Sequence, residues 1–193
     1  MHRAMAVLAR NMAILGGIVL GLLILLVCAS VLGRSLNGFL HTVLSPVAPD
    51  LAQALLDTGV GPINGDFELV EAGIAFAIFA FLPLCQITGG HATVDIFTNF
   101  LPPRANRGLR MVTEVVFAAV LIVIAWRLFE GMWSKMSYGE TTFLLQFPIW
   151  WAYAASFVGA VVAALVGTYT AIVRSYETFS GQTILTDGPE TDH

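Results

Sequence analysis

The side chains best suited to chemistry in this chain are its four histidines and two cysteines. They are His2, His41, His91 and His193, with Cys28 and Cys85. No histidine lies in the middle of an apolar run, where two could hold a haem between helices. The cysteines do lie in apolar runs, where thiols are usually inert, and they lack metal-ligand spacing. Because nucleophile motifs and phosphate loops are also missing, we predict no enzyme activity and no catalytic, cofactor-binding or metal-binding residue.

The composition is that of a membrane protein. Hydrophobic residues make up 57% of the 193 positions and charged residues only 11%. Soluble domains usually carry about a quarter charged residues, so the sequence indicates an integral membrane protein. The formal net charge is −4, and the sequence has no basic cluster of the kind that binds nucleic acid.

Four apolar segments are long enough to cross a bilayer. They predict an all-α integral membrane protein with a single domain over residues 1–193. The spans cover about residues 11–33, 66–88, 109–129 and 147–173, and a flexible tail covers about 178–193. The first segment is too long for a signal peptide, so it is predicted to be an uncleaved span.

The connections between these spans differ in length. We expect Arg34 to close the first span, followed by a long connection over residues 35–65 that prolines and glycines interrupt. Within it, residues 50–57 could form two turns of amphipathic helix, and loops of this length usually have a function or a partner. Residues 131–146 are predicted to be a shorter connection between the third and fourth spans.

Residues 92–101, between the second and third spans, predict a short amphipathic helix on the membrane surface. Phe97 and Phe100 fall on its apolar arc, and Asp95 falls on the polar side in the first turn. His91 precedes this turn, where it could hydrogen-bond Asp95 or remain a solvated loop residue. The alternative for the whole stretch is an ordinary polar loop.

Charged residues gather where the second span begins. Asp66 is predicted to be its N-cap, and Glu68 and Glu71 follow near the positive end of the helix dipole. Because Arg34 ends the first span on the same side, we expect it to lie near Glu68 and Glu71. The alternative is three independent solvated charges. Ion pairs between exposed side chains contribute little to stability.

Proline, aromatic and small residues mark the fourth span. Pro148 suits its first turn, and Trp150 belongs to an aromatic belt of the kind found at membrane interfaces. Gly159 and Ala163 belong to a run of small residues at three- and four-residue spacing, which predicts a face for close helix packing. A second pair of small residues, Gly17 and Gly21, lies in the first span. The alternative for this pair is glycine without a packing role, which is common in membrane helices.

The positive charges predict the orientation, because cytoplasmic loops carry an excess of Lys and Arg. Four spans place both termini and the middle connection on one side of the membrane. That side holds Arg3, Arg10, Arg104, Arg107, Arg110 and Arg174, and the other side holds Arg34, Arg127 and Lys135. We therefore expect both termini to be cytoplasmic and the 35–65 connection to be external.

The predicted spans carry almost no polar residue near the bilayer midplane, where a transporter or membrane enzyme places its working groups. Every charged residue falls at a span end or in a connection, and Arg127 and Glu130 have the i,i+3 spacing of an ion pair. An apolar bundle of this kind indicates an accessory or anchoring subunit.

Two stretches of the sequence resemble a known family. The first is Gly90-His91-Ala92-Thr93-Val94-Asp95, and the second has Glu140, Thr141, Leu144, Pro148 and Trp150 at fixed spacing. Together with the pattern over about residues 10–174, they resemble the small membrane subunit of tripartite ATP-independent periplasmic (TRAP) transporters, the DctQ type. The 35–65 connection is longer than that family leads us to expect.

The resemblance implies a structural role in the inner membrane of a bacterium. Such subunits bind a large membrane subunit that carries the substrate and sodium sites and moves as an elevator. A periplasmic substrate-binding protein delivers the substrate, typically an organic acid. The small subunit would be a scaffold that braces the large one, with lipids as its other partners and no cofactor.

Two other functions remain open on the sequence alone. The chain could anchor a redox complex in the membrane, which the placement of its histidines disfavours. It could also be an autonomous small transporter, which the apolar spans disfavour.

Overall fold

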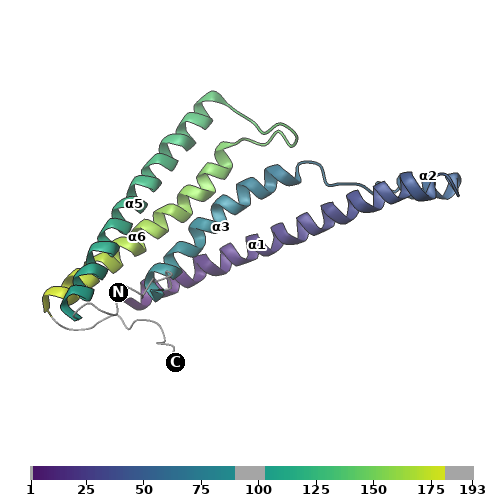
Figure 1. The fold of residues 1–193 in the computed structure, drawn as a ribbon. Helices are drawn as coiled ribbons and strands as arrows, with labels where there is room; N and C mark the ends of the chain where they lie inside the picture. Colours follow the sequence, from purple (N-terminus) through teal and green to yellow (C-terminus); the bar gives the residue numbers. More distant parts are fainter. Residues whose placement is uncertain (1, 90–102, 181–193) are drawn as a thin grey trace, which may run out of the picture.

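The computed structural model describes residues 2–89 and 103–180, and this part of the chain is helical apart from its connections (Figure 1). The elements are α1 (His2–Phe39), the π-helix η1 (Leu40–Leu44), α2 (Pro49–Leu56), α3 (Asp66–Thr88), α5 (Pro103–Tyr138) and α6 (Trp150–Ser180). Within the described ranges there is no β-strand, and a single β-bridge joins Thr141 to Pro148.

Four helical segments are long and apolar enough to cross a membrane, which confirms the predicted all-α fold with four spans. They cover His2–Leu44, Asp66–Thr88, Gly108–Tyr138 and Trp150–Thr178. The surface helix predicted at residues 92–101, with His91, Asp95, Phe97 and Phe100, lies outside the described residues and stays a prediction.

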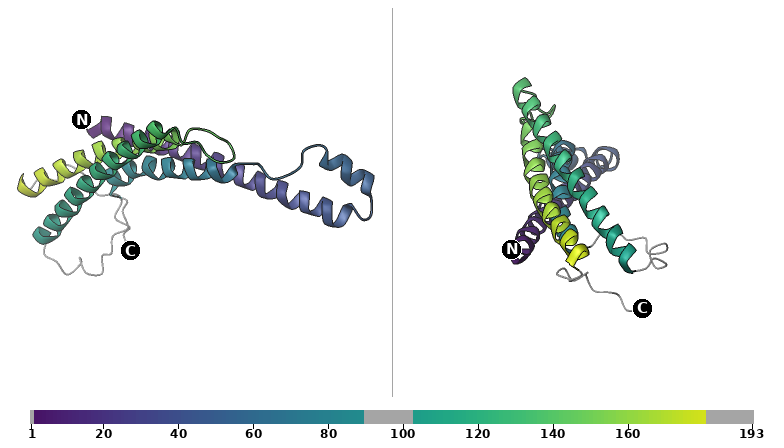
Figure 2. Two further views of the ribbon diagram at one scale, coloured as in Figure 1. Left: turned by 90° about the horizontal axis from the view of Figure 1, so that it is seen from above. Right: turned by 90° about the vertical axis from the view of Figure 1, so that its left-hand side faces the viewer.

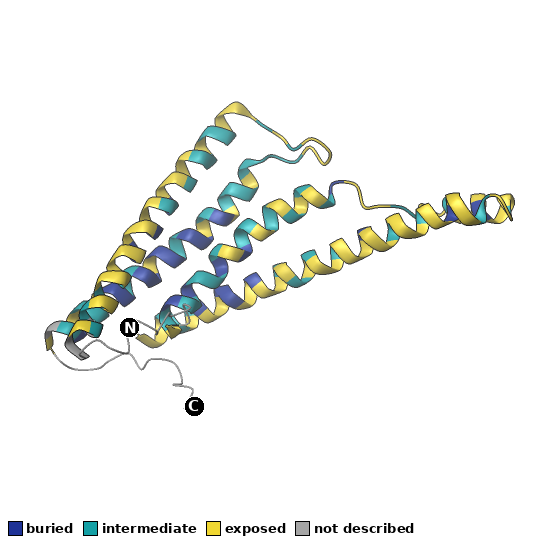
Figure 3. Cartoon of the chain, in the orientation of Figure 1, coloured by how far each residue is buried: buried dark blue, intermediate teal, exposed yellow. Residues whose placement is uncertain are grey.

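The helices α1, α3, α6 and α5 lie side by side in that order, so α6 is sandwiched between α3 and α5 (Figure 1). Half of the apolar window of α6 is buried within the chain, against 17% for the windows of α1 and α5. Figure 3 shows the same distribution, with buried residues concentrated along α6. The core therefore follows α6, and the outer helices offer large apolar surfaces to lipid or to a partner.

Small residues set the close contacts around α6. A Cβ atom on Gly159 would lie 2.9 Å from the Cβ of Phe79 in α3, and Ala163 is fully buried. The predicted small-residue face of the fourth span therefore does pack against a helix of the same chain. In α1 the glycine that contacts α3 is Gly16, because an added Cβ there would lie 2.8 Å from the Cβ of Ala80. The predicted pair, Gly17 and Gly21, faces open space instead.

Two helices extend well beyond the predicted spans. The first continues past Arg34 through η1, because no proline occurs before Pro46. The third continues through the first half of the predicted 131–146 connection and ends before Gly139, which adopts a φ of +63° that other residues rarely tolerate. The apolar windows underestimated these lengths because a helix need not end where its hydrophobicity does.

Three further boundaries differ from the predictions. The N-cap of α3 is Gly65 and not Asp66, which is the first helical residue. Pro148 precedes α6 and pairs with Thr141 across the β-bridge, so it does not lie in the first turn. The helix α6 continues to Ser180, beyond the predicted span end and slightly into the predicted tail.

The end of α1 forms an arm with η1 and α2 that projects past the other helices (Figures 1 and 2). The continuous helical stretch is 43 residues, or about 65 Å long, whereas the hydrocarbon core of a bilayer is about 30 Å thick. The short helix α2 packs back on η1 and buries Ala52 and Leu40. The two turns of helix predicted inside the 35–65 connection are thus confirmed.

Candidate functional site

One group of polar contacts lies where α3 begins. Three parts of the chain meet there: the second half of α1, the first two turns of α3, and the loop over residues 139–149 between α5 and α6. The start of α3 contacts both of the other parts, although all three are far apart in sequence (Figure 1). We treat this end of the bundle as the candidate site.

Asp66 joins α1 to α3. The hydroxyl of Ser30 donates a 2.6 Å hydrogen bond to the Asp66 carboxylate and accepts one, at 3.3 Å, from the backbone N–H of Ile63. One turn further along α1, the Arg34 guanidinium lies 3.9 Å from the same carboxylate. The sequence prediction grouped Arg34 with Glu68 and Glu71, so it assigned the wrong acidic partner. The sequence predicts Asp66 as the N-cap of α3, whereas Gly65 occupies that position.

Glu68 holds the loop against α3. Its two carboxylate oxygens accept hydrogen bonds from the backbone N–H groups of Leu144 and Leu145, at 2.7 and 2.9 Å. The side chain of Leu145 covers Gly65, where a Cβ atom would overlap it. Gly65 also has a φ of +79°, so a side chain there would be strained as well as crowded. We call this arrangement, Glu68 with Leu144 and Leu145, the Glu68 clasp.

The loop has internal bonds that keep it compact. Backbone N–H groups of Thr142 and Ile149 donate to the carbonyls of Phe147 and Glu140, both at 3.0 Å. The Lys135 ammonium at the end of α5 lies 2.6 Å from the Glu140 carboxylate. The predicted interface residue Glu140 is therefore tied to α5 within this chain.

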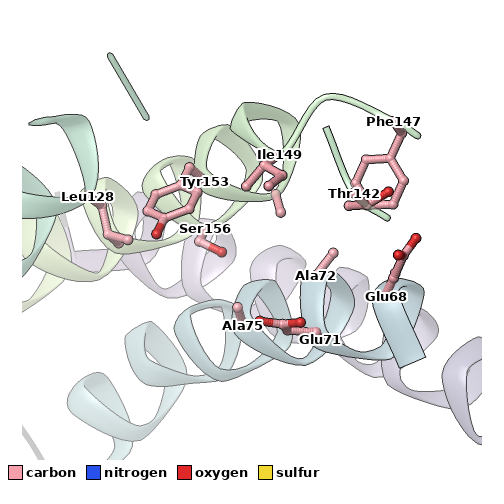
Figure 4. Close-up of a pocket in the computed structure, with 11 residues that line it drawn as sticks. Glu68, Glu71, Ala72, Ala75, Leu128, Thr142, Phe147, Ile149, Tyr153 and Ser156 are labelled. Carbon is pink, nitrogen blue, oxygen red and sulfur yellow. The ribbon is translucent and has the colours of Figure 1, made fainter. Parts of the chain in front are cut away.

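A pocket of about 340 Å³ opens between α3, α6 and the loop (Figure 4). Its walls are mostly apolar, and its polar groups come from three places: the acidic turns of α3, the loop, and the first turns of α6. The lining residues are Glu68, Glu71, Ala72, Ala75, Leu128, Thr142, Phe147, Ile149, Ala152, Tyr153 and Ser156. Carboxylates, hydroxyls and an aromatic ring can bind a cation or a hydrogen-bond donor.

The other predicted interface residues are distributed along α6. Gly159 and Ala163 lie in the core below the pocket, and Trp150 lies at the start of α6, in an edge-to-face contact with Trp151. On α5, Arg127 and Glu130 form the predicted ion pair at 2.8 Å.

Sequence reasoning missed two hydroxyl groups of this site. Ser30 lies within the predicted first span and Ser156 within the predicted fourth span, and neither is among the predicted site residues. The residue type could have indicated these positions, because a polar residue such as serine inside a membrane helix usually has a partner or a role.

The comparisons with known proteins give one match. A family model described as "Tripartite ATP-independent periplasmic transporters, DctQ component" matches residues 23–177. No curated protein and no solved structure matches the chain. The matched range includes every residue of the candidate site, from Ser30 to Ser156.

Proposed function

Since this chain belongs to the DctQ component family of tripartite ATP-independent periplasmic transporters, we propose that it is a scaffold subunit that braces the large membrane subunit during transport. As a family member with four spans, it is a multi-pass protein of the inner membrane and a component of a transporter. The proposed cargo is an organic acid, taken up with sodium and delivered by a periplasmic binding protein.

The observation that carries this proposal is the position of polar groups relative to the core. Leu121, Ala163 and Ala164 form a buried hydrophobic cluster with Leu82 packed against it, and the buried polar residues Gln86 and Thr170 lie towards the ends of α3 and α6. The contacts of the candidate site lie instead at one end, where they fix helices to one another. A bundle with an apolar centre and tied helix ends suits a rigid support better than a substrate pathway.

The proposed orientation places both termini in the cytoplasm. The candidate site, at the opposite end of the bundle, would then face the periplasm with the arm of α1, η1 and α2. This placement rests on the positive-inside rule. It would put the arm on the side from which the binding protein approaches.

Reconstitution in liposomes tests the proposal. Purified chain alone, large subunit alone, and both together are each supplied with the periplasmic binding protein, loaded substrate and an inward sodium gradient. We expect uptake only when both membrane subunits are present, because the small subunit has no substrate site of its own. Sodium-driven uptake by the isolated chain would contradict the scaffold role, and unimpaired uptake by the large subunit alone would contradict the need for a brace.

A further inference from the structure

Glu71 is a carboxylate inside a membrane helix that has no ion-pair partner in the described part of the chain. It lies five residues after Asp66, or about 7.5 Å further along α3, and it is exposed in this chain. The neighbouring Glu68 differs, since both of its oxygens accept backbone N–H groups. Acidic side chains within membrane-spanning helices are rare and usually pair with another charge.

The pocket beside Glu71 contains a second polar group that needs a partner. Ser156 is 2% exposed, and its Oγ atom has no hydrogen-bond partner among the described residues. It lines the pocket from α6, across from Glu71 and Ala75 on α3 (Figure 4). A buried hydroxyl without a partner loses hydration with nothing in return, so the geometry favours an incoming donor.

From these contacts we propose that the pocket receives a lysine or arginine side chain from a membrane helix of the large subunit. The inference rests on the proposed function, because it requires that partner. The ammonium or guanidinium group would pair with the Glu71 carboxylate and donate a hydrogen bond to Ser156. Its methylene stem would lie along the apolar wall formed by Ala72, Ala75 and Leu128.

Charge and size favour this occupant. The described lining includes two carboxylates and no basic residue, and two basic side chains on α5, Arg127 and Lys135, are in ion pairs with other acids. At about 340 Å³ the pocket is near the lower end of the usual range of about 300–1,000 Å³ for ligand sites. An ammonium lipid would also bring a phosphate, which the two carboxylates would repel, whereas a basic side chain carries only the cation.

Binding of the large subunit to variants of this chain tests the proposal. Wild type, Glu71→Gln, Ser156→Ala and the control Glu130→Gln are reconstituted in nanodiscs of phosphatidylcholine and phosphatidylglycerol, and the large subunit is titrated against each. Glu130 is the matched control because it is an exposed acid on α5 outside the pocket. Circular dichroism and thermal unfolding verify that each variant folds as wild type does.

We expect affinity to fall about tenfold or more for Glu71→Gln, because the partner's cation would lose its counter-charge. Ser156→Ala should weaken binding by a smaller factor of about fivefold, and Glu130→Gln should bind as wild type does. Equal affinity for Glu71→Gln and wild type would overturn the proposal while leaving the scaffold role intact. If wild type itself failed to bind the large subunit, the proposed function and this inference would both fall.

A lipid occupant gives a different result. In nanodiscs that also contain phosphatidylethanolamine, native mass spectrometry of the isolated chain measures how much of this lipid it retains. Retention that Glu71→Gln abolishes, together with unchanged binding of the large subunit, would assign the pocket to lipid and overturn the proposal. Equal retention of phosphatidylethanolamine by wild type and Glu71→Gln, together with the affinity losses above, supports the proposal.

Discussion

The hydroxyl of Ser30, in the second half of α1, donates a 2.6 Å hydrogen bond to the carboxylate of Asp66, the first residue of α3. Ser30 is fully buried, and the Asp66 side chain is 14% exposed, so the bond is shielded from water. Nearer the other end of the same helix pair, Gly16 closes on Ala80. The bond therefore fixes α1 against α3 at one end, and close packing does so at the other.

Replacing Ser30 with alanine should destabilise the isolated subunit by about 1–3 kcal/mol, because the shielded Asp66 carboxylate loses its hydroxyl donor. Thermal unfolding in detergent, followed by circular dichroism, measures the change. Ser35→Ala is the matched control, since Ser35 is an exposed serine of the same helix. Equal stability of the two variants would show that the bond contributes nothing.

Replacing Glu68 with glutamine should loosen the loop over residues 139–149. A glutamine offers one acceptor oxygen, whereas the carboxylate accepts the N–H groups of both Leu144 and Leu145 with full negative charge. Hydrogen exchange at these two amides should become severalfold faster, because each amide loses a charged acceptor. Glu71→Gln, one turn along the same helix, should leave both amides unchanged; a similar acceleration there would argue against the clasp.

Enlarging Gly159 to leucine should disrupt the contact between α6 and α3. An added Cβ would already lie 2.9 Å from the Cβ of Phe79, so a full leucine forces the helices apart, at a cost of roughly 1–3 kcal/mol. Ala163→Leu, in the fully buried core, should have a comparable effect. The control is Gly17→Leu, because no atom lies within 4 Å of a Cβ there. In detergent, Gly159→Leu and Ala163→Leu should be less stable than wild type, and Gly17→Leu should not. A Gly159→Leu variant as stable as wild type would contradict the observed packing.

Labelling of introduced cysteines should show that the two ends of the bundle face opposite sides of the membrane. Ser45 follows η1 in the arm, and Asn106 lies near the start of α5, at the other end (Figure 1). In a background with serine at positions 28 and 85, an impermeant thiol reagent added outside should modify Ser45→Cys and not Asn106→Cys. Modification of both from the same side would contradict the four-span topology, and the reverse pattern would invert the proposed orientation.

Features that depend on short-range patterns were predictable from the sequence alone. Apolar runs of sufficient length gave the four spans, because transfer into a bilayer depends on the composition of each segment alone. The Arg127–Glu130 pair followed from i,i+3 spacing on one helix. The packing face around Gly159 followed from the period of small residues. Helix ends were less well determined, since α1 and α5 continue where hydrophobicity falls but no proline intervenes.

Contacts between polar groups that are distant in sequence could not be predicted and are seen in the fold. Glu68 and Leu144 are 76 residues apart, and Ser30 and Asp66 are 36 apart, so their contacts depend on how far one helix is shifted along another. Arg34 could have faced any of three acids by sequence, and the rotation of α1 selected Asp66. The pocket beside Glu71 and Ser156 likewise exists only because α3, α6 and the loop converge at one end. The type of a side chain determines which groups it can bind. The relative shift and rotation of the helices determine which of those groups lie within contact distance.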